Sequence, residues 1–204
     1  RDLGARLAEL THNAAVAYDA QRYVAFLGRV YRFQESVLRW IMENVCELPT
    51  DQSPEKREET QVTWQARIAA HAQLREYLED IELKKGKSLD YTMISVPTMK
   101  AIAKFVVREN RRADGTPYLT KGELGPFYGA LDMLNKLDPL VKLRHRTIIA
   151  HDFEGVSEAI LQEKYKGNPA TDLYRILEKF QVPIDVNPFD QVAEKLVQAL
   201  NQSA

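Results

Sequence analysis

Ten residues, 143–152, hold most of the reactive side chains that the sequence places close together. They read LRHRTIIAHD and include Arg144, His145, Arg146 and His151, so that two of the four histidines of the chain lie here. An imidazole exchanges a proton near neutral pH, and a guanidinium stays positive and stabilises the negative charge of a phosphoryl transition state. RNA carries its own nucleophile, the 2′-hydroxyl. The segment therefore has the groups for RNA cleavage without a metal.

Helical periodicity indicates how this segment is positioned. Apolar residues recur every three or four positions from Leu3 to Ala17 and again from Tyr23 to about Leu48, which predicts two helices in an antiparallel hairpin. A third helix is expected around residues 64–81. Residues 84–125 contain Gly86 and a turn-rich stretch, with one short helix from about Pro97 to Val106, and we interpret this range as an irregular insertion.

Three Asx-Pro pairs mark further helix starts. A helix is expected after Pro126, and Asp138 with Pro139 predicts an N-cap and first turn for the helix that carries the reactive segment through His151. Asn168 with Pro169, and Asn187 with Pro188, predict two more helices. Strand signals are nearly absent, so we predict an all-α bundle, in one domain over residues 1–204. The chain opens inside a helical pattern without Met, which favours the C-terminal part of a longer protein.

Composition narrows the class of function. The 28 Lys and Arg residues against 29 Asp and Glu residues give a net charge of −1, which argues against a constitutive, high-affinity duplex binder. The single cysteine, Cys46, forms no internal disulfide and completes no thiolate metal site, so we expect neither a metal nor another cofactor. No apolar run is long enough to span a bilayer. These features predict a soluble, cytoplasmic protein without a membrane partner.

The reactive segment also resembles a known family. Arg146 and His151 fit the signature of HEPN ribonucleases, an Arg followed after four to six residues by a His, and Arg144 with His151 fits it too. The stretch from Leu143 to Ser157 is similar to the HEPN segment of the ancillary ribonucleases of type III CRISPR systems. The opening hairpin is similar to the first two helices of that family at Leu10, Asn13, Ala14, Arg22, Tyr23, Arg29, Tyr31, Arg32 and Glu35. The 84–125 insertion lies outside the resemblance.

The resemblance implies an activity and a set of roles. Members of the family cleave single-stranded RNA without metal in antiviral defence, as homodimers in which both motifs face one cleft. Their N-terminal sensor domain, which this chain lacks, binds a cyclic oligoadenylate activator. Arg146 and His151 are then the expected catalytic pair, with Arg144, His145 and Thr147 as substrate contacts. Thr147 stands where the family has Asn, although its hydroxyl also forms hydrogen bonds.

Helix geometry favours a different arginine. On an unbroken helix, Arg144 and His151 lie within about 20° of each other, whereas Arg146 and His151 are about 140° apart. The family alignment selects Arg146, and a distorted helix or a partner subunit would reconcile the two.

Two alternative functions and a plainer interpretation of the motif remain open. The chain is compatible with a stand-alone HEPN toxin or with a catalytically inactive helical dimerisation module. In the plainer interpretation, Arg144 and Arg146 are solvated and pair with acids such as Asp138 or Asp152, and His151 only caps a helix end. Glu35 is expected either to pair with Arg32 or to orient a motif arginine.

Overall fold

The computed structural model describes residues 3–83, 86–146 and 155–182. It divides the chain into two compact units, one formed by residues 1–34 with 129–204 and the other by residues 35–128. Within the described residues, regular structure consists of helices α1 to α9 and one hairpin of two-residue strands. The all-α class predicted from the sequence is confirmed. A single domain over residues 1–204 stays a prediction, to which the structure adds this division into two units.

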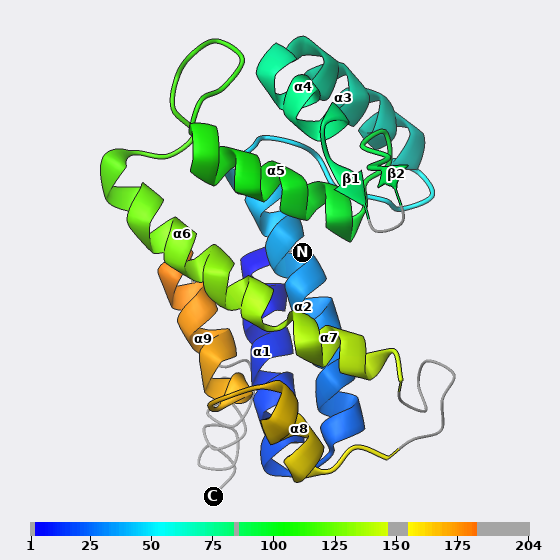
Figure 1. The fold of residues 1–204 in the computed structure, drawn as a ribbon, viewed down its shortest axis with the longest axis vertical. Coiled ribbons are helices and arrows are strands. Elements are labelled where there is room, and N and C mark those ends of the chain that lie inside the picture. Colours follow the sequence, from blue (N-terminus) through cyan, green and yellow to red (C-terminus); the bar gives the residue numbers. More distant parts are fainter. Residues whose placement is uncertain (1–2, 84–85, 147–154, 183–204) are drawn as a thin grey trace, which may run out of the picture. The chain divides into compact units, whose positions relative to one another are not determined.

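The first unit is built from helices at both ends of the chain. It contains α1 (Leu3–Asp19), the first half of α2 (Tyr23–Asn44), the end of α6 (Lys121–Lys136), α7 (Asp138–Arg144), α8 (Glu158–Lys164) and α9 (Pro169–Lys179). Helix α1 packs on α9, and α7 contacts α8 (Figure 1). Between α1 and α2 the chain turns at Gln21, where φ is 55°, and the Tyr18 ring meets the rings of Tyr23 and Phe26 at centroid distances of 6.0 and 5.1 Å.

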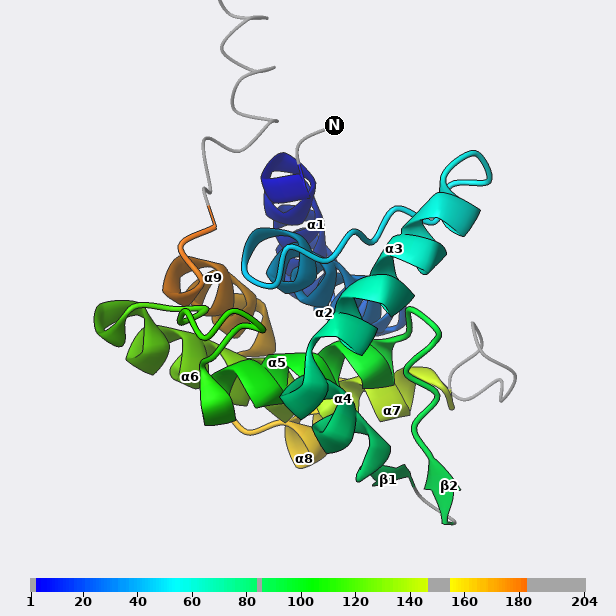
Figure 2. The same cartoon turned by 90° about the horizontal axis from the view of Figure 1, so that it is seen from above.

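The second unit is formed by the middle of the chain. It contains the second half of α2, α3 (Arg57–Ala70), α4 (Ala72–Glu79), strands β1 (Glu82–Leu83) and β2 (Lys87–Ser88), α5 (Val96–Glu109) and the start of α6. The strands pair antiparallel, with Glu82 opposite Ser88. Helix α4 packs against both α3 and α5 (Figure 2). The fully buried Trp64 donates from its indole nitrogen to the Tyr91 carbonyl at 3.2 Å.

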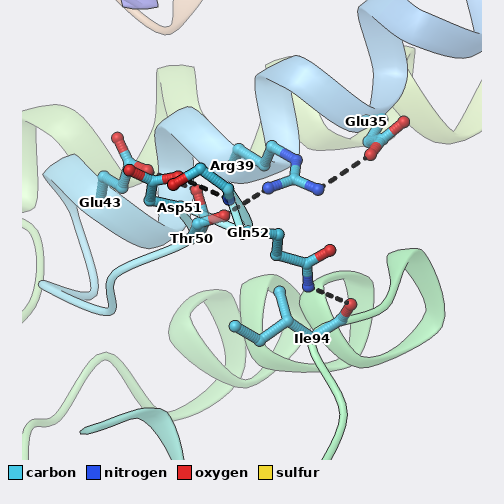
Figure 3. A network of polar contacts seen from close by, with 8 residues as sticks. Glu35, Arg39, Glu43, Thr50, Asp51, Gln52 and Ile94 are labelled. Atoms are coloured by element: carbon cyan, nitrogen blue, oxygen red, sulfur yellow. Dashed lines mark hydrogen bonds and ion pairs between the residues drawn. The ribbon is translucent and has the colours of Figure 1, made fainter. Parts of the chain in front are cut away.

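Polar contacts fix the irregular connection that follows α2 (Figure 3). Arg39 donates to the Thr50 carbonyl and forms an ion pair with Glu35 at 3.0 Å. The Thr50 hydroxyl donates to the Glu43 carboxylate, and the Gln52 amide donates to the Ile94 carbonyl at 3.2 Å. The connection from residue 50 to 52 is thereby held to α2 on one side and to the residues before α5 on the other.

The third predicted helix is broken in two at His71. The backbone there has φ −103° and ψ 85°, outside the helical region. Its Nδ1 accepts from the Leu74 backbone at 3.3 Å and caps α4, while Nε2 contacts the Arg111 carbonyl at 2.9 Å. These partners fit the neutral ring with its proton on Nε2. The apolar periodicity runs through both helices without a Gly or Pro, so it contained no sign of the break.

Helix α6 begins five residues earlier than expected. The prediction placed its start at Pro126, but Thr120 and Glu123 form a capping box in front of Lys121. The Glu123 carboxylate accepts from the Thr120 N–H at 2.8 Å. Pro126 then lies inside α6, where it removes one backbone hydrogen bond. Residues 84–125, expected to be an irregular insertion, therefore contain β2, all of α5 and the start of α6.

The start of α7 also differs from the prediction. Asp138 is the first helical residue, and its N-cap position is taken by Leu137, which makes no side-chain cap. The carboxylate of Asp138 instead accepts from the Gln34 amide at 2.7 Å, and the same amide donates to the Leu134 carbonyl at 3.1 Å. Gln34 is only 2% exposed. This buried side chain therefore attaches the α6–α7 corner to α2.

Two helices at the end of the described chain begin with side-chain caps. Asn168 caps α9 by accepting from the Thr171 N–H at 3.0 Å, as predicted. Ser157 caps the unpredicted α8 by accepting from the Ile160 N–H at 3.4 Å. The helix predicted at Asn187 lies outside the described residues. Among those that are described, no helix has the length and apolar character that crossing a bilayer requires.

Replacing Gln34 tests the bridge between α2 and the α6–α7 corner. Gln34→Met keeps the length of the side chain but removes the amide that donates to the Leu134 carbonyl and the Asp138 carboxylate, so the free energy of unfolding should fall by roughly 1–3 kcal/mol. The exposed Gln65→Met is the matched control and should change it by less than about 0.5 kcal/mol. Urea unfolding followed by circular dichroism measures both. Equal unfolding midpoints for the two variants would contradict the role given to Gln34.

Candidate functional site

Two residues of the reactive segment meet at one tyrosine of α2. The guanidinium carbon of Arg144 lies over the Tyr31 ring, 4.6 Å from its centroid. The His145 ring meets the same ring edge-on, with the centroids 6.3 Å apart and an interplanar angle of 71°. The guanidinium carbon of Arg32, the neighbour of Tyr31 on α2, lies 5.8 Å from the centroid of the Tyr31 ring. Tyr31, Arg32, Arg144 and His145 form what we call the Tyr31 cluster.

The Gln34 bridge explains why these side chains meet. Tyr31 and Gln34 are three residues apart on α2 and therefore share one face of that helix. Gln34 holds Asp138 at the start of α7, and Tyr31 contacts Arg144 at the end of α7. The two contacts occur in opposite order along the two helices. The α7 chain therefore runs against α2 here and delivers its last turn to Tyr31.

Arg146 follows the cluster in a turn. Helix α7 ends at Arg144, His145 is its C-cap, and the Arg146 N–H donates to the Leu143 carbonyl at 2.9 Å. The Arg146 side chain is exposed, and within the described residues its guanidinium forms no hydrogen bond or ion pair. The prediction of one helix from Asp138 through His151 is thus wrong at residues 145 and 146. The angular comparison of Arg144 and Arg146 on an unbroken helix does not apply.

The remaining predicted site residues are not placed. Thr147 and His151 lie outside the described residues, as does Asp152, so their roles stay predictions. The structure brings Arg144 and His145 together and leaves Arg146 next to them in sequence. Glu35 forms an ion pair with Arg39, and its expected pairing with Arg32 or with a motif arginine stays a prediction. Asp138 accepts a hydrogen bond from Gln34, and its expected pairing with a motif arginine stays a prediction.

Sequence reasoning missed the side chains that support the site. Tyr31 was part of the family resemblance of the opening hairpin, but its contact with Arg144 was not predicted. Gln34 carried no prediction. Its position three residues after Tyr31, within the apolar stripe of α2, was the available signal, because a polar residue in such a stripe must find hydrogen-bond partners.

The chemistry that the cluster offers is anion binding. Arginine side chains donate several N–H groups in one plane, which suits the oxygens of a phosphodiester. Two guanidinium groups around one ring raise the local density of positive charge on a chain that is nearly neutral overall, and the His145 ring adds a hydrogen-bonding group. In the part of the chain that the structure describes, no three His, Cys, Asp or Glu side chains are grouped so that they could hold a metal ion.

Comparison with known proteins adds no relative: no protein family, no curated protein and no solved structure matches the chain. The resemblance of the reactive segment to HEPN ribonucleases therefore rests on the motif residues themselves.

A tyrosine ring over a guanidinium should be visible by NMR. The ring current of Tyr31 should shift the Nε–Hε resonance of Arg144, and Tyr31→Leu should remove that shift while Tyr31→Phe retains it. Tyr128→Leu, which replaces a 60% exposed ring, is the control and should leave the resonance in place. An arginine side-chain spectrum unchanged by Tyr31→Leu would show that the contact does not form in solution.

Proposed function

We propose that the chain is a metal-independent endoribonuclease of the HEPN type that cleaves single-stranded RNA. The observation that carries the proposal is the Tyr31 cluster, which gathers Arg144 and His145 at the end of α7 and is followed directly by the exposed Arg146. These side chains belong to the segment whose residue types suit phosphoryl transfer. The spacing of Arg146 and His151 in the family signature supports the same assignment.

The proposed reaction uses the nucleophile of the substrate. The 2′-hydroxyl loses its proton and its oxygen bonds to the adjacent phosphorus, while the bond from phosphorus to the 5′-oxygen breaks and that oxygen gains a proton. The products are a 2′,3′-cyclic phosphate and a 5′-hydroxyl. His151 manages the protons or positions the 2′-hydroxyl, and Arg146 holds the scissile phosphate as its charge develops. Arg144, His145 and Thr147 contact the neighbouring substrate.

The proposal extends to an assembly and a setting. Each chain supplies only one Arg–His motif, which offers few catalytic groups for the whole reaction. Two copies are therefore proposed to form a homodimer with both motifs at one cleft. The setting is type III CRISPR antiviral defence, in which this chain is the ribonuclease part of a longer protein. A cyclic oligoadenylate would then act on the sensor domain of that protein and not on residues 1–204.

A catalytically inactive dimerisation module is the second candidate. The contact that favours it is also that of Arg144 with Tyr31, because packing a guanidinium on a ring stabilises a helix pair without any substrate. In this case the motif arginines would serve the fold or the interface, and their replacement would weaken association.

Cleavage in EDTA separates the two candidates. The parent chain, Arg146→Ala, His151→Ala and the control Lys142→Ala are incubated with a fluorescent single-stranded RNA, and their oligomeric state is measured at the same concentration. Lys142 is exposed on α7 and has the same charge as the arginines but no assigned role. The parent and the control should cut to a 2′,3′-cyclic phosphate, and the two motif variants should lose roughly 10²-fold or more of the rate.

The other outcomes are informative as well. Equal cleavage by all four proteins would remove Arg146 and His151 from the catalytic machinery. An inactive parent whose dimer dissociates in the motif variants would support the dimerisation module. Cleavage that needs a divalent ion would contradict the metal-independent mechanism.

A further inference from the structure

The second unit contains a cavity that the proposed ribonuclease site does not use. It measures about 290 Å³ and lies between the end of α2, the break between α3 and α4, and the loop that follows α5. All of its lining residues fall within residues 35–128. Its apolar wall includes Cys46, Leu48, Ile68 and Leu74, which are buried side chains. An apolar wall with a few converging polar groups is typical of small-molecule sites.

Two arginines stand at the cavity and share one carboxylate. Arg112 Nη1 lies 2.9 Å from Glu47 Oε1, and Arg67 Nη1 lies 3.8 Å from Glu47 Oε2. Two further contacts hold the Arg112 side chain. Its Nη2 donates to the Val45 carbonyl at 3.1 Å, and its guanidinium lies 4.9 Å from the centroid of the Tyr118 ring. The Arg112 side chain is only 26% exposed, which makes it a preorganised anion-binding group.

The loop that supplies Arg112 and Tyr118 is itself rigidly tied. Asn110 ends α5 in the left-handed conformation, and its side chain both donates to and accepts from the Leu119 backbone at 2.8 Å. Asp114 lines the cavity, but its carboxylate accepts two hydrogen bonds from Thr116, and these bonds lower its pKa. Asp114 thus forms its hydrogen bonds within the turn, while its charge also attracts Arg112.

Glu47 is an unusual residue at its position. It lies three residues after the end of α2 with φ 56°, a conformation in which Gly or Asn is common, and the next residue, Leu48, donates from its N–H to the Met42 carbonyl at 2.8 Å. A side chain in this left-handed region costs roughly 1–2 kcal/mol. Its carboxylate is 61% exposed although it bridges the two arginines. The left-handed conformation thus does not favour Glu at residue 47, and its side chain is in contact with solvent.

We infer that this cavity binds a small organic anion. The anionic group of the ligand takes the place of the Glu47 carboxylate between Arg67 and Arg112, and its apolar body lies against Ile68, Leu74 and Cys46. A planar carboxylate and a phosphate both fit the donors of the two arginines. The inference is independent of RNA cleavage, because none of its residues belongs to the reactive segment.

Four probe compounds separate the two parts of the ligand. Benzoate and phenyl phosphate carry an apolar ring and an anion, benzyl alcohol carries the ring alone, and acetate carries the anion alone. In NMR titrations of the whole chain, at least one of the two ring-bearing anions should bind about tenfold or more tightly than benzyl alcohol and acetate. The stronger of benzoate and phenyl phosphate identifies the anionic group.

Variants assign the binding to the arginines. Arg112→Met and Arg67→Met should each weaken binding, Arg112→Met by about tenfold or more, and Glu47→Gln should strengthen it about two- to fivefold by removing a competing carboxylate. Arg108→Met, which replaces a 69% exposed arginine outside the cavity lining, is the control and should change nothing. Within the described residues the Arg67 guanidinium pairs with Glu47 alone, so its variant tests the site without loss of the Val45 contact.

The single cysteine gives a second measurement at the cavity. Burial raises the pKa of the Cys46 thiol to about 12, so its alkylation is slow at neutral pH and becomes faster as the pH is raised. A bound ring-bearing anion should slow this alkylation, and acetate should not. Equal binding of benzoate, phenyl phosphate and benzyl alcohol, unchanged affinity in both arginine variants, or no protection of Cys46 would each overturn the inference.

Discussion

The buried amide of Gln34 is the constraint on which the candidate ribonuclease site depends. A primary amide taken out of water must find partners, and here both partners lie at one corner, the Leu134 carbonyl and the Asp138 carboxylate. Because this corner joins α6 to α7, satisfying the amide also sets where α7 begins on α2. One helical turn before Gln34, the same face of α2 carries Tyr31, which meets the last residue of α7. The hydrogen bonds of the buried Gln34 amide thus help to determine which side chains meet at Tyr31.

Apolar periodicity, together with capping residues close in sequence, predicted several of the helices. Helices α1, α2, α5 and α9 follow from apolar spacing and from caps such as Asn168. The break at His71 was not predictable in this way, because the ring is held by the carbonyl of Arg111, forty residues away. The early start of α6 was predictable, since Thr120 and Glu123 have the spacing of a capping box. The prediction began this helix after Pro126, whereas the proline lies inside α6.

The candidate site, like the fold, was predictable from the sequence only in part. Residue type and spacing identified Arg144, His145 and Arg146 as neighbours, and the structure places the first two around Tyr31. The support from α2 was not predicted, because Gln34 and Asp138 are separated by 104 residues and only the fold brings them together. The choice between Arg144 and Arg146 was argued from an unbroken helix. Since α7 ends at Arg144, the two arginines differ instead in packing, one on a ring and the other exposed.

Both units hold an arginine over a tyrosine, and the comparison explains what such a pair is suited to do. Arg144 lies over Tyr31 at 4.6 Å and Arg112 over Tyr118 at 4.9 Å. The ring attracts the charge through its face, whereas the five N–H donors of a guanidinium lie in its own plane and point to its edge. At Arg112 these donors reach the Val45 carbonyl and the Glu47 carboxylate. A ring-held guanidinium therefore loses little side-chain entropy when it receives an oxyanion at its edge, and this property suits a phosphodiester at one unit as well as a small anion at the other.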